Sequence, residues 1–253
     1  MLATAWGGAV LFVASLSYFA YFYLVQLGRP VEATAEAVPR AVALNAALFT
    51  TFALHHSLFA RTGLKHRLAR VLPSGLERSI YVWVASLLFA AVCLLWQPLP
   101  GVAWHVSGPA RWLLHIVQVA GVLITVQSAS RIDIWELAGV RQARAAGSPS
   151  GSAVPSSARP APSAAAASAS STATPLTIAG PYRWLRHPIY LGWMLFVFAA
   201  PLMTHGRLLF AGISTLYLIV AIPIEERTLN TAFGPAYRDY QRQVRWRLVP
   251  GIW

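Results

Sequence analysis

Residues 189–224 read IYLGWMLFVFAAPLMTHGRLLFAGISTLYLIVAIPI, two apolar runs that meet at the tripeptide HGR, residues 205–207. The runs, 189–205 and 208–224, approach the length of about 20 residues that a helix needs to cross a bilayer. In lipid, a helix satisfies every backbone polar group within its own segment. The stretch therefore predicts two membrane helices that form a tight hairpin.

The composition of the whole chain points the same way. Of its 253 residues, 57% are hydrophobic and 11% are charged, whereas soluble domains carry about 25% charged residues. Further apolar segments that are long enough to span a bilayer lie at about 4–27, 41–60, 79–97 and 110–130. The expected fold is an all-α, polytopic integral membrane bundle of about six transmembrane helices.

The charged residues predict the topology. The net charge is +12, from 20 basic and 8 acidic residues, and most basic residues lie in 61–78, in 131–188 and after residue 224. These are alternate connections, so the positive-inside rule predicts that both termini are cytoplasmic, in a bacterial inner membrane. No long basic run is present, so we expect the charges to face the lipid bilayer and not nucleic acid.

A low-complexity stretch divides the chain. Residues 145–174, AAGSPSGSAVPSSARPAPSAAAASASSTAT, are almost entirely Ala, Ser, Pro and Gly. Such a composition lacks the large apolar surface that offsets the entropy of ordering, which predicts a disordered linker. The linker separates an N-terminal four-helix membrane region, 1–144, from a C-terminal hairpin region, 175–253.

Polar motifs flank the predicted hairpin on both sides. GPYRWLRHPIYLG, residues 180–192, enters it, and the pair Glu225 and Glu226 leaves it. The open ends of a hairpin meet, so His187 and Tyr190 are expected to approach the glutamates. Acidic residues at a membrane boundary indicate function when they face protein.

The residue types at this place indicate a particular ligand. Pro188 suits the first turn of a helix, whose free N–H groups and positive dipole end can hold a carboxylate. S-adenosylmethionine has a zwitterionic head and a cationic sulfonium, which favours aromatic faces; these could come from Tyr182, Trp184, Tyr190 and Trp193. Alternatively, the aromatic and basic residues only anchor the helix ends at the interface.

The C-terminal region resembles the membrane methyltransferases of the isoprenylcysteine carboxyl methyltransferase group. The shared pattern is G-x-Y…R-H-P-x-Y-x-G, a helical hairpin, and then E-E-x-x-L…F-G-x-x-Y-x-x-Y. It is matched here by Gly180, Tyr182, Arg186, His187, Pro188, Tyr190, Gly192, Glu225, Glu226, Leu229, Phe233, Gly234, Tyr237 and Tyr240. The resemblance implies that S-adenosylmethionine is the cofactor and that its site contains Leu176, Thr177, Tyr182, Arg186, His187, Pro188, Tyr190, Glu225 and Glu226.

A second resemblance concerns the methyl acceptor. Three segments are similar to NnrU-like membrane proteins and, more closely, to bacterial methanethiol S-methyltransferases: HHSLFAR (55–61), LERSIYVWVASLLFA (76–90) and DIWELAGVRQ (133–142). The hairpin segment FAAPLMTHGRLLFA (198–211) also resembles the methanethiol S-methyltransferases. This implies transfer to a small hydrophobic thiol, methanethiol, giving dimethyl sulfide. Prenylcysteine methyltransferases carry an arginine about one helical turn before the cofactor glutamate, where this chain has Ala221. That departure disfavours a prenylcysteine carboxylate as substrate.

A thiol acceptor needs a base, because the thiolate is the nucleophile. His56 and Asp133 stand at the predicted cytoplasmic ends of apolar segments, and either can take a proton. Each could instead make a structural hydrogen bond.

The pair His55–His56 could suggest a metal or haem ligand. Neighbouring helical residues point apart, however, and Cys93 is the only cysteine, so no metal site is predicted.

The sequence leaves other functions open. The chain could methylate a prenylcysteine, a phospholipid or another lipid. It could be a non-catalytic NnrU-like accessory protein of denitrification, which predicts no S-adenosylmethionine binding. A transporter would need polar residues at the bilayer midplane and an internal repeat, which the sequence does not show. The preferred expectation is S-adenosylmethionine-dependent methyl transfer at the cytoplasmic membrane face.

Overall fold

The computed structural model describes residues 2–32, 34, 36–59, 77–131 and 178–253. Its helices are α1 (Leu2–Tyr21), which a π-helical turn extends over Phe22–Gln26, α2 (Ala37–Phe59), α4 (Glu77–Leu95), α5 (Ala110–Ala129), α8 (Pro188–Phe198), α9 (His205–Phe233) and α10 (Pro235–Gln243). Two short strands, β1 (Val102–His105) and β2 (Leu202–Thr204), pair antiparallel. Each predicted apolar segment forms a helix, which confirms the all-α polytopic membrane fold.

The helices differ in how far they can reach across a bilayer. Four are long and apolar enough to cross it: Leu2–Gln26, Ala37–Ser57, Ala110–Ala129 and His205–Phe233. The apolar helix Ser79–Leu95 is somewhat shorter. Helix α8 has only 11 residues, a rise of about 16 Å, against a hydrocarbon core of about 30 Å. It therefore reaches roughly halfway.

The fifth predicted segment, 189–205, thus ends its helix early. Pro201 lacks an N–H and disfavours helical geometry at Ala200, and the chain then continues through β2. Partners from the β1 region satisfy the backbone here: Trp104 Nε1 donates to Ala200 O at 3.1 Å and Val106 N to Pro201 O at 2.8 Å. The hairpin between α8 and α9 consequently turns through a strand.

The last turn of α8 is held by side chains from other helices. Gln118 of α5 donates its amide to Phe196 O at 3.1 Å, and the hydroxyl of Tyr23 donates to Val197 O. Carbonyls at a helix end have no intrahelical partner, and none can be left unpaired in an apolar surrounding. These two bonds explain how a helix can stop inside the bundle.

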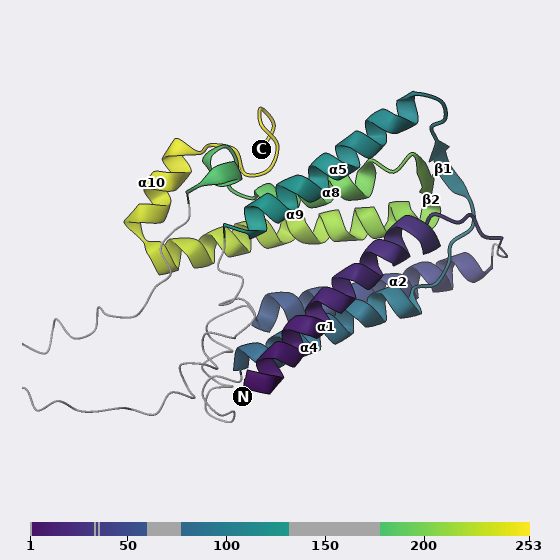
Figure 1. Ribbon diagram of the computed structural model, residues 1–253, viewed down its shortest axis with the longest axis horizontal. Coiled ribbons are helices and arrows are strands. Elements are labelled where there is room, and N and C mark those ends of the chain that lie inside the picture. The colour runs from purple at the N-terminus through teal and green to yellow at the C-terminus, as the bar shows by residue number, and fades with distance from the viewer. Residues whose placement is uncertain (1, 33, 35, 60–76, 132–177) are drawn as a thin grey trace, which may run out of the picture.

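The two open ends of the hairpin, the start of α8 and the end of α9, lie at one end of the bundle (Figure 1). The starts of α1, α4 and α8 and the ends of α2, α5 and α9 lie at this end, on the left of the view, whereas β1 and β2 lie at the other. The helix ends that flank the predicted basic connections thus lie at the same end of the bundle. Because β1 and β2 are far from α10, we call the two ends the α10 end and the strand end.

Helix α8 makes its most extensive contact with α5, across a crossing of two glycines. A Cβ built on Gly192 would lie 2.6 Å from Gly121 O, and one built on Gly121 would lie 2.5 Å from Gly192 O. Only glycine allows backbones to approach so closely. This contact gives Gly192, the glycine of the R-H-P-x-Y-x-G pattern, a physical reason.

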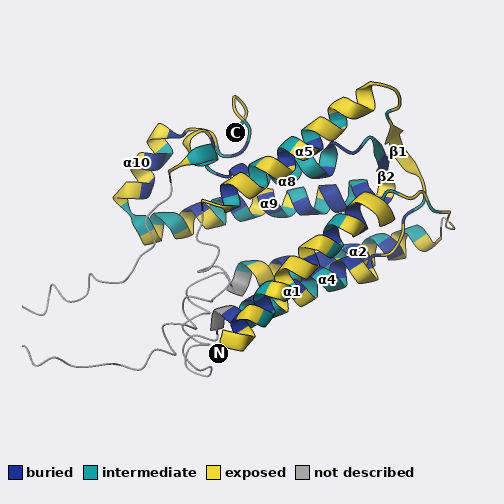
Figure 2. Cartoon of the chain, in the orientation of Figure 1, coloured by how far each residue is buried: buried dark blue, intermediate teal, exposed yellow. Residues whose placement is uncertain are grey.

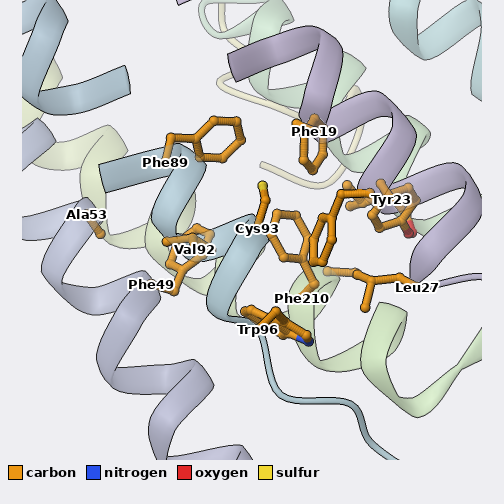
Figure 3. Packing of buried hydrophobic residues seen from close by; sticks show 13 residues of the cluster. Phe19, Tyr23, Leu27, Phe49, Ala53, Phe89, Val92, Cys93, Trp96 and Phe210 are labelled. Atoms are coloured by element: carbon orange, nitrogen blue, oxygen red, sulfur yellow. The ribbon is translucent and has the colours of Figure 1, made fainter. Parts of the chain in front are cut away.

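An aromatic core joins α9 to the N-terminal helices (Figure 3). Phe210 is fully buried at its centre, with ring centroids 5.4 Å from Phe19 and Trp96 and 5.7 Å from Phe49. Figure 2 shows exposed outer faces on α1 and α5, and these carry large apolar side chains such as Val10 and Leu113. Lipid covers such faces in a membrane protein.

At the strand end, Arg207 of the HGR tripeptide is buried. Its guanidinium donates to Tyr23 O at 3.0 Å, Leu24 O at 2.8 Å and Leu202 O at 2.5 Å. The bonds satisfy carbonyls of the π-helical end of α1 and of β2, so Arg207 ties these elements to the start of α9.

Candidate active site

The C-terminal tail, residues 234–253, aligns the R-H-P segment, residues 186–188. Residues Gly180–Arg183 form one 3-10 turn, and Pro188 starts α8. Between them, Arg186 N donates to Trp246 O at 3.0 Å and His187 N to Arg247 O at 2.9 Å. The guanidinium of Arg186 also donates to the carbonyls of Val244 and Arg245. The tail is therefore part of the scaffold that holds His187.

Glu226 is the buried centre of an ionic cluster. Its side chain is 5% exposed and lies 2.7 Å from Arg186 Nε, 3.1 Å from Arg247 Nε and 3.4 Å from His187 Nε2. A buried carboxylate is stable only when its charge and its lone pairs are satisfied. Two guanidinium groups do this here, so Glu226 joins the two motifs and the tail.

Glu225, its neighbour, has a different environment. Its side chain is 44% exposed, and its Oε2 accepts a hydrogen bond from Tyr190 at 2.7 Å and lies 3.6 Å from His187 Nδ1. The rings of His187 and Tyr190 stack, with centroids 5.4 Å apart. An open carboxylate beside stacked aromatic rings can receive a cation.

Tyrosines surround the cluster and stay neutral. Burial, together with the charge of Glu225, raises the pKa of Tyr182 to about 12. Burial also raises the pKa of Tyr237 and of Tyr240 above the ordinary value, and the charge of Glu226 adds to the effect. Tyr240 donates to Tyr182 O at 2.8 Å. At neutral pH these phenols act as hydrogen-bond donors and carry no charge.

The first turn of α8 offers less to an anion than its sequence suggests. Pro188 has no N–H, and the amides of Tyr190 and Leu191 donate to His187 O at 3.1 and 3.2 Å. Within the described part of the chain, Ile189 has the only amide of this turn that makes no hydrogen bond. One amide alone is a weak anion site.

The structure brings together Tyr182, Arg186, His187, Pro188, Tyr190, Glu225 and Glu226 of the predicted site. Leu176, Thr177 and Asp133 lie outside the described residues.

His56 is described, and its Nδ1 is 2.9 Å from the hydroxyl of Tyr81 on α4. The next residue, Ser57, lies 3.1 Å from the hydroxyl of Tyr217 on α9.

Sequence reasoning missed Arg247 and the Ser57–Tyr217 pair. Arg247 is one of several arginines in the tail, and nothing in its spacing distinguishes it from Arg245. Its contact with Glu226 depends on how the tail folds back over the R-H-P segment. For Ser57 and Tyr217, the only available signal is that both are polar side chains within apolar segments.

Comparison with known proteins adds a family to this geometry. The family model described as "Phospholipid methyltransferase" matches residues 168–236, which include the R-H-P segment and both glutamates. The comparison with solved structures finds no match.

Several curated proteins are similar over most of the chain. Methanethiol S-methyltransferase 2 of Bradyrhizobium diazoefficiens is 38% identical over 84% of this chain and 74% of its own length. Methanethiol S-methyltransferase of Mycobacterium tuberculosis is 36% identical over 84% of this chain and 80% of its own length. Nurim of Xenopus laevis is 29% identical over 70% of this chain and 58% of its own length.

Proposed function

Because the chain belongs to the family of the methanethiol S-methyltransferases, we propose that it transfers a methyl group from S-adenosylmethionine to methanethiol, giving dimethyl sulfide. The observation that carries this proposal is the environment of Glu225. Its carboxylate is open to a ligand, whereas the adjacent Glu226 is occupied by two arginines. The pair thus divides into a binding group and a structural group.

The residues present fit S-adenosylmethionine. The carboxylate of Glu225 suits the ammonium of the amino-acid head, and the stacked rings of His187 and Tyr190 present aromatic faces to a cation. Tyr182 adds a neutral phenol close enough for the charge of Glu225 to affect its pKa. Leu176 and Thr177 complete the proposed site, together with Arg186, Pro188 and Glu226, which hold its shape.

When bound, S-adenosylmethionine supplies an electrophilic methyl group on its sulfonium. The acceptor sulfur would take this methyl group, and the cofactor would leave as S-adenosylhomocysteine. The chain contributes chiefly by holding the reactants in line. The acceptor's S–H proton passes to a base, for which we propose His56 or Asp133, because a thiolate is the better nucleophile.

The side chains on the face of α9 that ends at Glu225 favour a small, uncharged methyl acceptor. Tyr217, Ala221 and Glu225 follow at four-residue intervals and so lie on one side of the helix. Ala221 is small and neutral, so this face offers no cation to a substrate carboxylate. Methanethiol needs none, which favours it over a prenylcysteine.

We place the reaction at the cytoplasmic face of a bacterial inner membrane, with both termini cytoplasmic. In support, the cluster lies at the α10 end of the bundle, where the connections with most of the basic residues begin and end. The positive-inside rule assigns that end to the cytoplasm.

The decisive test measures dimethyl sulfide in the headspace of cells that express the chain and receive methanethiol. Cells expressing Glu225→Gln are the matched control. Calorimetric titration of the purified chain with S-adenosylmethionine tests the cofactor separately. Absence of binding would favour a non-catalytic accessory protein.

A lipid methyltransferase is the second candidate, because a family model named for phospholipid methylation matches the site region. Its test is methyl label from S-adenosylmethionine in the lipid extract of the same cells. Label in lipid without dimethyl sulfide would select this candidate.

A further inference from the structure

Arg247 occupies an unusual position in the ionic cluster. It comes from the tail, beyond the motifs that carry the family resemblance, and its Nε donates to Glu226 at 3.1 Å. One face of its guanidinium lies over the ring of Trp253, at 5.4 Å from the ring centroid. These two contacts hold the group in a defined orientation.

The outer atoms of this guanidinium are available to a ligand. Within the described ranges, the Nη atoms of Arg247 donate no hydrogen bond, and the side chain is 34% exposed. The side chain of Arg186, by contrast, is 8% exposed, and its Nη1 donates hydrogen bonds to two carbonyls of the tail. Of the two arginines that share Glu226, only Arg247 thus faces outward.

The charges of the cluster match a zwitterion. Arg186 and Arg247 share the single negative charge of Glu226, which leaves positive charge on the outward-facing Arg247. Glu225 carries a negative charge that no arginine or lysine among the described residues pairs with. His187 lies 3.6 Å from Glu225 and 3.4 Å from Glu226, the carboxylate that Arg247 contacts, so Glu225 and the Arg247–Glu226 pair both border this side chain.

We propose that Arg247 binds the carboxylate of the cofactor's amino-acid head, opposite Glu225, which binds its ammonium. The inference rests on the proposed function and adds a residue to it. It also supplies a group that can bind the carboxylate, because the first turn of α8 offers only one free amide. An arginine fork binds a carboxylate through two parallel hydrogen bonds, which one amide cannot do.

The test compares two ligands on the full chain purified in detergent. One is S-adenosylhomocysteine, and the other is its decarboxylated analogue, which keeps the ammonium. The wild-type chain is expected to prefer the first. Arg247→Ala is expected to weaken S-adenosylhomocysteine roughly 10- to 100-fold and to leave the analogue almost unchanged. Arg242→Ala, an exposed tail arginine paired with Asp239, is the matched control and should change neither affinity.

The outcomes separate this inference from the proposed function. If Arg247→Ala weakens both ligands equally, Arg247 only supports Glu226, and the inference is wrong while the function stands. If the wild-type chain binds neither ligand, both are wrong. If Arg247→Ala does not fold, Arg247→Lys is tested instead. One lysine ammonium cannot bind both Glu226 and the carboxylate of the ligand. The preference of this variant for S-adenosylhomocysteine should fall about fivefold or more, and an unchanged preference would overturn the inference.

Discussion

Arg186 donates its Nε to the carboxylate of Glu226 at 2.7 Å, although 40 residues separate them. This bond joins the motif that enters the helical hairpin to the one that leaves it. It also occupies Glu226, which leaves its neighbour Glu225 as the carboxylate available to a ligand. The roles of the two glutamates can therefore be tested by the same substitution at adjacent positions.

Glu225→Gln is expected to abolish most cofactor affinity and to leave the protein folded. The carboxylate is 44% exposed and its protein partners are neutral or shared, so its loss costs little stability. Binding of S-adenosylhomocysteine should weaken by roughly 100-fold, as for a lost charge-assisted contact. Calorimetry measures the affinity, and unchanged affinity would remove Glu225 from the site.

Glu226→Gln is expected to do the reverse and to destabilise the fold. It leaves the buried guanidinium of Arg186 without its counter-charge, and breaking a buried pair costs about 3–5 kcal/mol. Thermal unfolding of the two glutamine variants side by side gives the answer. Equal melting temperatures would contradict the structural role of Glu226.

Gly192→Ala is expected to destabilise the protein by about 1–3 kcal/mol, the usual cost of overpacking. The new Cβ would lie 2.6 Å from Gly121 O in α5, and backbone cannot yield as a side chain can. Gly212→Ala in α9 is the matched control, because nothing lies within 4 Å of its Cβ position. In thermal unfolding, the melting temperature of Gly192→Ala should be well below that of Gly212→Ala. The opposite order would argue against the close crossing of α5 and α8.

Arg207→Met is expected to weaken the strand end of the bundle. The substitution leaves the carbonyls of Tyr23, Leu24 and Leu202 without their donor. Each buried carbonyl without a partner lowers the free energy of unfolding by about 1–3 kcal/mol. Arg40→Met, an exposed arginine at the same end of the bundle, should change stability little. S-adenosylhomocysteine affinity of the folded fraction should be unaffected, because Arg207 lies at the end opposite the site.

His56→Gln and Asp133→Asn test the proposed base. Loss of the base should lower kcat for methanethiol by about 10²–10⁴ and should leave the affinity for S-adenosylhomocysteine unchanged. The deficit should shrink as pH rises, because the thiol then ionises without help. If neither variant lowers kcat, the proton goes elsewhere. Tyr182 is a poor alternative base, because its pKa of about 12 keeps it protonated.

Much of the fold follows from local chemistry. An apolar run in lipid must form a helix to satisfy its own backbone, so the six apolar helices could be predicted from residue types alone. The approach of His187 and Tyr190 to the glutamates followed from the hairpin, since the open ends of a hairpin meet. The early end of α8 was missed, because Gln118 and Tyr23, which donate hydrogen bonds to the carbonyls of its last turn, reach them only in the tertiary structure.

The division of labour inside the site came only from tertiary structure. Glu225 and Glu226 are identical residues, and their helical positions differ by about 100°, which is enough to bury one against Arg186 and Arg247 and to expose the other. Arg245 and Arg247 are likewise equivalent in sequence, and only the folded tail brings Arg247 to the cluster. Residue type decides which side chains can bind a charge, whereas packing decides which of them is left with a charge to bind.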